Sequence, residues 1–137
     1  KLSNYFTFSI IRNPLERQLS LFFFLWRLHG YQPTVEKFRK DFSSGCHMED
    51  TNNQILQTDY TTVNGVDYGT WWVYENIENH IRQFQSKHGK AKSILGKLKA
   101  GITPLDKINE FYDDKTKRAV YEYYQKDFNL YEALKGG

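Results

Sequence analysis

The first 26 residues contain the pattern that most restricts how this chain folds. Residues 5–11, YFTFSII, are aromatic or β-branched apart from one serine, which is typical of a buried strand. Asn13 and Pro14 then favour a helix start, because asparagine is a good N-cap and proline is tolerated in the first helical turn. Apolar residues follow at helical spacing: Leu15, Leu19, Phe22 and Trp26. The stretch therefore predicts a strand, a tight turn and a helix.

Three polar residues interrupt this apolar unit: Arg12, Arg17 and Ser20. Arg12 ends the strand, where ligands bind in open α/β sheets. Arg17 and Ser20 are three residues apart and share one helix face. Two guanidinium groups and a hydroxyl beside a helix start would suit a phosphate, since arginine presents a fork of donors and the helix adds positive potential. The spacing is equally compatible with a solvated helix face, so both interpretations stay open here.

Residues 11–20, IRNPLERQLS, resemble the second cofactor motif of sulfotransferases, roughly V-R-[DN]-P-x-x-R-x-x-S. The resemblance implies that Arg12 and Ser20 bind the 3′-phosphate of 3′-phosphoadenosine 5′-phosphosulfate (PAPS), or of adenosine 3′,5′-bisphosphate. Arg17 matches the motif too and is a further cofactor-binding candidate. The same resemblance implies a three-layer α/β/α domain with a mostly parallel, P-loop-NTPase-like sheet, of which this chain holds an incomplete part.

Other segments extend the resemblance along the chain. Residues 112–113 and 124–131 look like the family's closing signature, a Tyr-Asp pair followed by Y-x-x-D-F-x-L-[FY]. Residues 74–78 resemble the segment where a strand ends and a helix begins. There Glu75 is a candidate general base, or a structural carboxylate near a helix start. Residues 51–56 look like the N-x-Q stretch that lines the acceptor side in carbohydrate-type sulfotransferases, with a surface loop as the alternative.

The charge is unevenly distributed, although the net charge is only +3. From Arg82 to Lys107 there are seven Lys or Arg residues and one acid, Asp106. Such a run fits a solvated face or an anionic ligand. Similar proteins have a mobile basic loop here that closes over the nucleotide, which makes Lys97 and Lys99 cofactor-binding candidates. Nucleic acid is not the expected partner, because aromatic residues do not alternate with the basic residues as stacking platforms would.

Several other elements are predicted from local signals. They are a short helix over residues 35–42 capped by Thr34, a turn at Asn64-Gly65, a strand over 66–74, a helix ended by Gly89, and a last helix. That last helix is expected to start at Asp113 or Asp114, to run to Lys126, and to bury Ala119, Val120, Tyr123 and Tyr124.

At 137 residues, a single domain over 1–137 is expected. The lone cysteine, Cys46, excludes an internal disulfide and favours a reducing, cytoplasmic compartment, with the Golgi lumen as the alternative. No apolar run is long enough for a membrane span. The four histidines lack metal-ligand spacing, so no metal is expected.

Sulfotransferases also carry an N-terminal phosphate loop, P-K-x-G-[ST]-[ST], that grips the 5′-phosphosulfate, and this loop is missing from the sequence. The chain is therefore expected to be the C-terminal part of a sulfotransferase or a degenerate relative. The predicted function is transfer of a sulfuryl group from PAPS to a hydroxyl or amine of a small-molecule or carbohydrate acceptor. A non-catalytic nucleotide- or partner-binding module with the same fold is the alternative.

Overall fold

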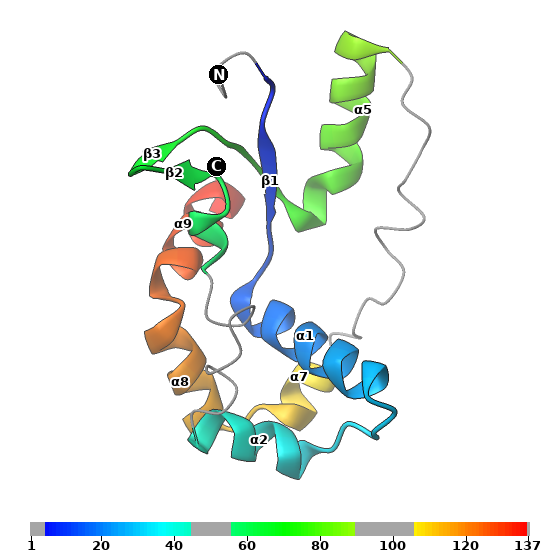
Figure 1. Cartoon of the computed structure of the whole chain (residues 1–137), viewed down its shortest axis with the longest axis vertical. Coiled ribbons are helices and arrows are strands. Elements are labelled where there is room, and N and C mark those ends of the chain that lie inside the picture. The colour runs from blue at the N-terminus through cyan, green and yellow to red at the C-terminus, as the bar shows by residue number, and fades with distance from the viewer. Residues whose placement is uncertain (1–4, 45–55, 90–105, 137) are drawn as a thin grey trace.

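The computed structural model describes residues 5–44, 56–89 and 106–136. Helices α1, α2, α7 and α8 fill the lower half of the molecule in Figure 1, while the strands, α5 and α9 lie in the upper half. The elements are, in chain order, β1 (Phe8–Ile11), α1 (Pro14–Leu28), α2 (Val35–Ser44), the 3₁₀ turn η2 (Gln57–Asp59), β2 (Thr62–Val63), β3 (Val66–Asp67), β4 (Thr70–Val73), the 3₁₀ turn η3 (Tyr74–Asn76), α5 (Ile77–His88), α7 (Asp106–Phe111), α8 (Asp114–Tyr123) and α9 (Gln125–Gly136).

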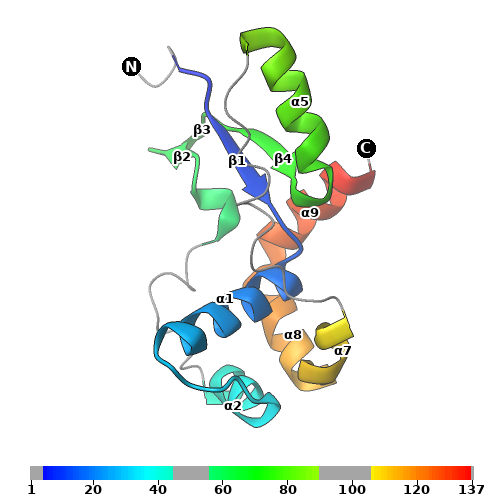
Figure 2. The same ribbon diagram turned by 90° about the vertical axis from the view of Figure 1, so that its right-hand side faces the viewer.

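Strands β1 and β4 form a parallel pair, with Phe8 opposite Thr70 and Ile11 opposite Val73. They run side by side in Figure 2. Because side chains alternate between the two faces of a strand, Trp72 and Val73 point to opposite sides. Trp72 stacks on Phe8, with ring centroids 4.2 Å apart, and on His80 of α5 at 5.4 Å. Val73 and Ile11 pack with Tyr131 of α9. This mixture of parallel strands and helices agrees with the predicted α/β class.

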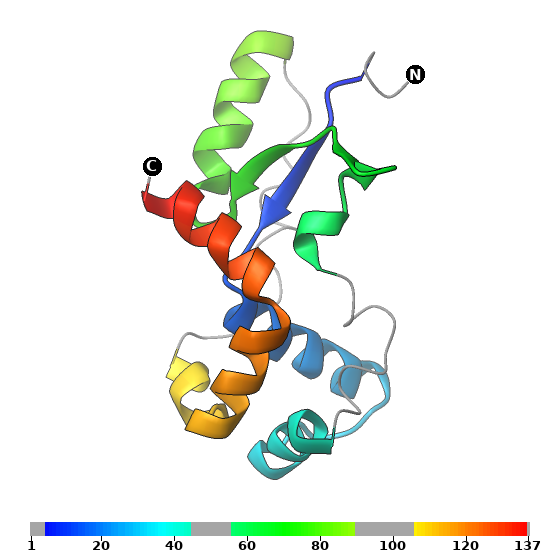
Figure 3. The same cartoon turned by 90° about the vertical axis from the view of Figure 1, so that its left-hand side faces the viewer.

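The larger hydrophobic core lies among the helices. Phe22 of α1 is at its centre, with its ring centroid 5.1 Å from that of Phe38 of α2. Helices α8 and α9 continue from this core toward the strands, as Figure 3 shows. The buried core residues are Leu15, Leu19, Phe22, Phe38, Phe42, Phe111, Tyr112, Val120, Tyr124 and Phe128. The helix that carries the candidate motif is therefore fixed on its apolar side by residues from the far end of the chain.

Several local predictions are confirmed. Asn13 caps α1, since its Oδ1 accepts a hydrogen bond from the Leu15 N–H at 2.9 Å. Thr34 caps α2, with its hydroxyl accepting from the Lys37 N–H at 3.3 Å. The predicted turn at Asn64-Gly65 joins β2 to β3, and both residues have positive φ, 52° and 77°. Such a two-residue turn needs residues that tolerate the left-handed region.

Three boundaries differ from the sequence-based expectations. The strand predicted over residues 5–11 is buried only at Ile11. Its ladder with β4 begins at Phe8, so Tyr5 and Phe6 precede the ladder and are exposed, and Phe8 is exposed as well. The strand predicted over 66–74 is broken into β3 and β4. The break follows from Asp67, whose Oδ1 accepts hydrogen bonds from the Gly69 N–H at 2.9 Å and from the Thr61 hydroxyl, turning the chain.

The predicted last helix is also two helices. Asp113 is the N-cap, and its side chain accepts from the Thr116 N–H at 2.8 Å. Helix α8 ends at Tyr123, however, and α9 follows at once and runs to Gly136. Because Tyr124 at the junction takes the core position, Tyr123 is 40% exposed and does not belong to the buried set that was predicted.

Candidate functional site

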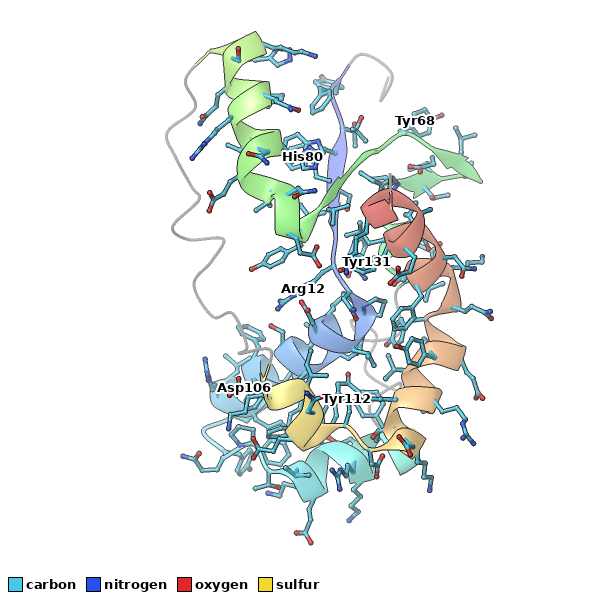
Figure 4. All side chains as sticks on the ribbon, turned by 180° about the vertical axis from the view of Figure 1, so that it is seen from behind. Arg12, Tyr68, His80, Asp106, Tyr112 and Tyr131 are labelled. Carbon is cyan, nitrogen blue, oxygen red and sulfur yellow. The ribbon has the colours of Figure 1, made fainter. Side chains whose placement is uncertain are left out.

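The turn between β1 and α1 places Arg12 at the carboxyl end of the parallel strands (Figure 4). Its Nε donates to Glu16 Oε2 at 3.2 Å, and its guanidinium carbon lies 4.7 Å from the centre of the Tyr74 ring. An arginine over an aromatic face is attracted by the ring quadrupole. Within the described residues, the two Nη groups of Arg12 have no hydrogen-bond partner. Arg12 is thus held by two neighbours on one side and can still donate to an anion.

Arg17 lies in the first turn of α1. Its Nη2 donates to the hydroxyl of Tyr60 at 2.6 Å, and its guanidinium carbon lies 5.8 Å from the centre of that ring. Its Nη1 is buried and finds no partner among the described residues. A buried charged donor without an acceptor is unfavourable by roughly 1–3 kcal/mol or more, so this atom is suited to an incoming acceptor.

Arg12, Arg17 and Ser20 line one surface pocket of about 300 Å³. The structure therefore brings together the three residues that the sequence analysis singled out. The remaining lining residues were missed: Leu21, Phe23, Phe24 and Arg27. A signal for Arg27 was present, because Ser20, Phe24 and Arg27 have the i, i+4, i+7 spacing of one helix face. The pocket is an apolar wall bordered by three arginines, and none of its described lining residues is a carboxylate.

Gln57 is a second residue that sequence reasoning missed. It is buried, and its side-chain amide exchanges two hydrogen bonds with the backbone of Arg12, each 2.9 Å long. Asp127, also buried, accepts from the N–H groups of Gln57 at 2.8 Å and of Thr58 at 3.0 Å. Asp127 belongs to the closing signature noted in the sequence, but nothing local in the sequence linked it to Gln57.

Glu75 is placed by its contact with α9. It follows β4, and its Oε1 accepts a hydrogen bond from the Tyr131 hydroxyl. Burial, and then this bond to Glu75, raise the pKa of Tyr131 above its usual value, so the phenol stays a neutral donor. The contact fits the structural interpretation of Glu75, a carboxylate that links the strand end to α9. Its role as a general base stays a prediction.

The remaining residues that the sequence analysis named are not among the described residues that line the pocket of Arg12. Lys97, Lys99, Cys46 and the stretch 51–55 fall outside the described residues. A hollow of about 440 Å³ lies between α5 and the strands and is lined by Phe6, Thr70, Trp71, Trp72, His80, Gln83, Phe84, Lys87 and His88. It contains His80, which Figure 4 shows well apart from Arg12.

The part of the chain that the structure describes offers neither a metal site nor a membrane-spanning helix. Among those residues, no group of three or more His, Cys, Asp or Glu could hold a metal ion. No described helix combines the length and the apolar character that crossing a membrane requires.

Comparison with known proteins gives one match. A family model described as "Sulfotransferase family" matches residues 1–94, which include the pocket, Gln57 and Glu75. The closing signature at 112–131 lies beyond the matched region. No curated protein and no solved structure matches the chain.

Proposed function

Because this chain belongs to the sulfotransferase family, we propose that its pocket at the start of α1 binds the 3′-phosphate of PAPS. Arg12 and Ser20 contact that phosphate, and Arg17 contributes a further charge-assisted hydrogen bond. The chain then acts in sulfuryl transfer from PAPS to a hydroxyl or amine of a small-molecule or carbohydrate acceptor. Lys97 and Lys99 are proposed to close over the nucleotide, and Glu75 is retained as a candidate base.

The observation that carries this proposal is the convergence of Arg12, Arg17 and Ser20 on one pocket at the carboxyl end of β1. Charge-assisted hydrogen bonds from arginine to phosphate are stronger than neutral ones and can be bidentate. The Nη1 atom of Arg17 supports the same conclusion, because it is buried and unpartnered among the described residues. The first turn of α1 adds its own positive potential for an anion.

The strand pair suggests how the pocket fits a larger fold. Helix α5 contacts Trp72 on one face of the pair, and α9 contacts Val73 on the other. We expect β1 and β4 to be part of a three-layer α/β/α, P-loop-like sheet in a single domain. The adenosine would then lie along the apolar wall formed by Leu21, Phe23 and Phe24.

A thermal-stability comparison of three nucleotides tests the ligand. Adenosine 3′,5′-bisphosphate should stabilise the protein more than adenosine 5′-phosphate, which lacks the 3′-phosphate. Adenosine 2′,5′-bisphosphate is the matched control, because it has the same charge at a different position. At a ligand concentration near 100 times Kd, the preferred nucleotide should add about 2.7 kcal/mol to the free energy of unfolding.

Equal stabilisation by all three nucleotides would contradict the assignment of Arg12 and Ser20 to a 3′-phosphate. If the bisphosphate binds but no sulfuryl transfer from PAPS is detected with a panel of hydroxyl and amine acceptors, the non-catalytic binding module replaces the enzyme as the better description.

A further inference from the structure

We propose that residues 57–60, held by Asp127, set the positions of both Arg12 and Arg17, and so determine how selectively the pocket recognises a 3′-phosphate. The proposal rests on the proposed function for its ligand, but the positioning itself is a property of the described residues. Gln57, Tyr60 and Asp127 do not line the pocket. They are positioning residues, because they act on the anion through the two arginines.

Gln57 fixes the backbone of Arg12. The ladder between β1 and β4 ends at Ile11, so the backbone groups of Arg12 have no partner in β4. The Gln57 side chain takes that place: its Oε1 accepts from the Arg12 N–H, and its Nε2 donates to the Arg12 carbonyl oxygen, both at 2.9 Å. Two parallel bonds from one planar amide restrict both the position and the tilt of the peptide units around Arg12.

Tyr60 fixes the side chain of Arg17. The Arg17 guanidinium lies near the ring of Tyr60 and donates from Nη2 to its hydroxyl at 2.6 Å. A long arginine side chain loses rotamer freedom when it is held in one geometry, and here the tyrosine imposes that loss before any ligand arrives. Such preorganisation improves affinity because less ordering remains to be done on binding.

Asp127 fixes the segment itself. Its Oδ2 accepts from the Gln57 N–H at 2.8 Å, and its Oδ1 accepts from the Thr58 N–H at 3.0 Å. The Gln57 Nε2 also lies 3.5 Å from Oδ2. The carboxylate therefore orients both the start of η2 and the side chain that holds Arg12. In this way one acidic residue on α9 sets the geometry of two arginines that are more than 100 positions away in the sequence.

The experiment compares nucleotide selectivity in two variants with that of the wild type. Tyr60→Phe removes only the hydroxyl of an exposed residue, and Tyr68→Phe is its control, since Tyr68 is also exposed and contacts neither arginine. Tyr60→Phe should lower the affinity for adenosine 3′,5′-bisphosphate by about three- to tenfold. It should also reduce the preference over adenosine 2′,5′-bisphosphate, while its melting temperature and that of Tyr68→Phe stay close to the wild-type value.

A merely structural role for Tyr60 would not change this preference. Gln57→Leu should reduce the preference more strongly, because the Arg12 backbone loses both of its bonds. Since Gln57 is buried, that variant could unfold, and Tyr60→Phe then decides the question alone. A Tyr60→Phe protein that keeps the wild-type affinity and preference overturns the positioning role.

A ligand-free measurement separates this inference from the proposed function. In NMR spectra of the free protein, rotation of the Arg17 guanidinium should be slow in the wild type and in Tyr68→Phe, and faster in Tyr60→Phe. If the wild type shows no preference among nucleotides, the proposed function fails, and these spectra decide the positioning. Identical Arg17 mobility in all three proteins overturns it.

Discussion

The hydroxyl of Tyr112 donates a buried hydrogen bond to the carbonyl oxygen of Leu15, at 2.7 Å and across 97 positions of the sequence. Figure 4 shows Tyr112 beneath the first helix, on the opposite side from the strands. Burial raises the pKa of Tyr112 well above its usual value, so the phenol remains a neutral donor. The bond joins the segment before α8 to the first turn of α1, which also carries Arg17 of the candidate anion site.

Replacing Tyr112 by phenylalanine tests this link. Tyr112→Phe should lower the free energy of unfolding by about 0.5–1.5 kcal/mol, because the ring is kept and one net hydrogen bond is lost. Urea unfolding measures the loss, and nucleotide affinity should not change. A much larger loss, together with lost affinity, would mean that the hydroxyl also sets the shape of the pocket.

A second prediction concerns Phe22 and Phe24, which lie two positions apart on α1. Phe22 is 2% exposed in the helical core, whereas Phe24 is 60% exposed and lines the pocket. Phe22→Ala should therefore reduce stability by about 3–5 kcal/mol. Phe24→Ala should cost far less stability and instead weaken adenosine nucleotides. Melting temperatures and nucleotide titrations of the pair decide this, and equal destabilisation would contradict the described packing.

The pH dependence of stability has a predictable contribution from Asp113. The hydroxyl of Thr116, and then its backbone N–H, donate to this carboxylate and lower its pKa. Because the folded-state pKa is below the unfolded-state value of about 3.9, the contribution is complete above that value and is lost as the pH falls through the folded pKa. Acid should therefore remove stability that depends on Asp113.

Asparagine and alanine at position 113 separate the charge from the cap. Asp113→Asn should have the same free energy of unfolding as the wild type near pH 7, since asparagine is also a good N-cap. In acid it should not lose the part of that stability that depends on the Asp113 charge. Asp113→Ala should lose about 0.5–2 kcal/mol near pH 7. Urea unfolding at about pH 7 and about pH 3 measures both. A wild type and an Asp113→Asn variant with the same acid dependence would exclude this contribution.

Local sequence signals predicted the part of the site that residues 12–20 form. Asn13 and Pro14 fixed where the helix starts, and helical spacing then placed Arg17 and Ser20 on one face, which is why the pocket contains both. The partners of the arginines could not be found this way. Gln57 is 45 positions from Arg12, and Tyr60 is 43 from Arg17. Their contacts depend on how α9 holds η2, which is a tertiary property.

The same reasoning explains the errors at the strand and helix boundaries. Periodicity could not show that Asp67 would accept from Gly69 and Trp71 and so break one predicted strand in two. It also could not distinguish Tyr123 from Tyr124, because both are aromatic and adjacent. Only the end of α8 decides which of the two faces the core.

The last prediction separates the proposed anion-binding role of Arg12 from its ion pair with Glu16. Arg12→Ala should weaken adenosine 3′,5′-bisphosphate by roughly ten- to hundredfold, since a charge-assisted hydrogen bond is worth about 1.5–3 kcal/mol. Arg12→Lys should recover only part of that affinity, because an ammonium group cannot donate to two phosphate oxygens in the same planar geometry. Ser20→Ala should cost about 0.5–1.5 kcal/mol of binding free energy. Isothermal titrations measure all three.

Glu16→Gln is the control for the ion pair in these titrations. The Arg12 and Glu16 side chains are each 15% exposed, so removing either partner should cost some stability. Only Arg12→Ala removes a proposed ligand of the phosphate, however. Glu16→Gln leaves an amide oxygen that can still accept from the Arg12 Nε but removes a nearby negative charge, and it should therefore keep or increase the affinity for the bisphosphate. If instead both variants lose stability equally and neither changes affinity, Arg12 serves only the ion pair, and the 3′-phosphate has to be bound elsewhere.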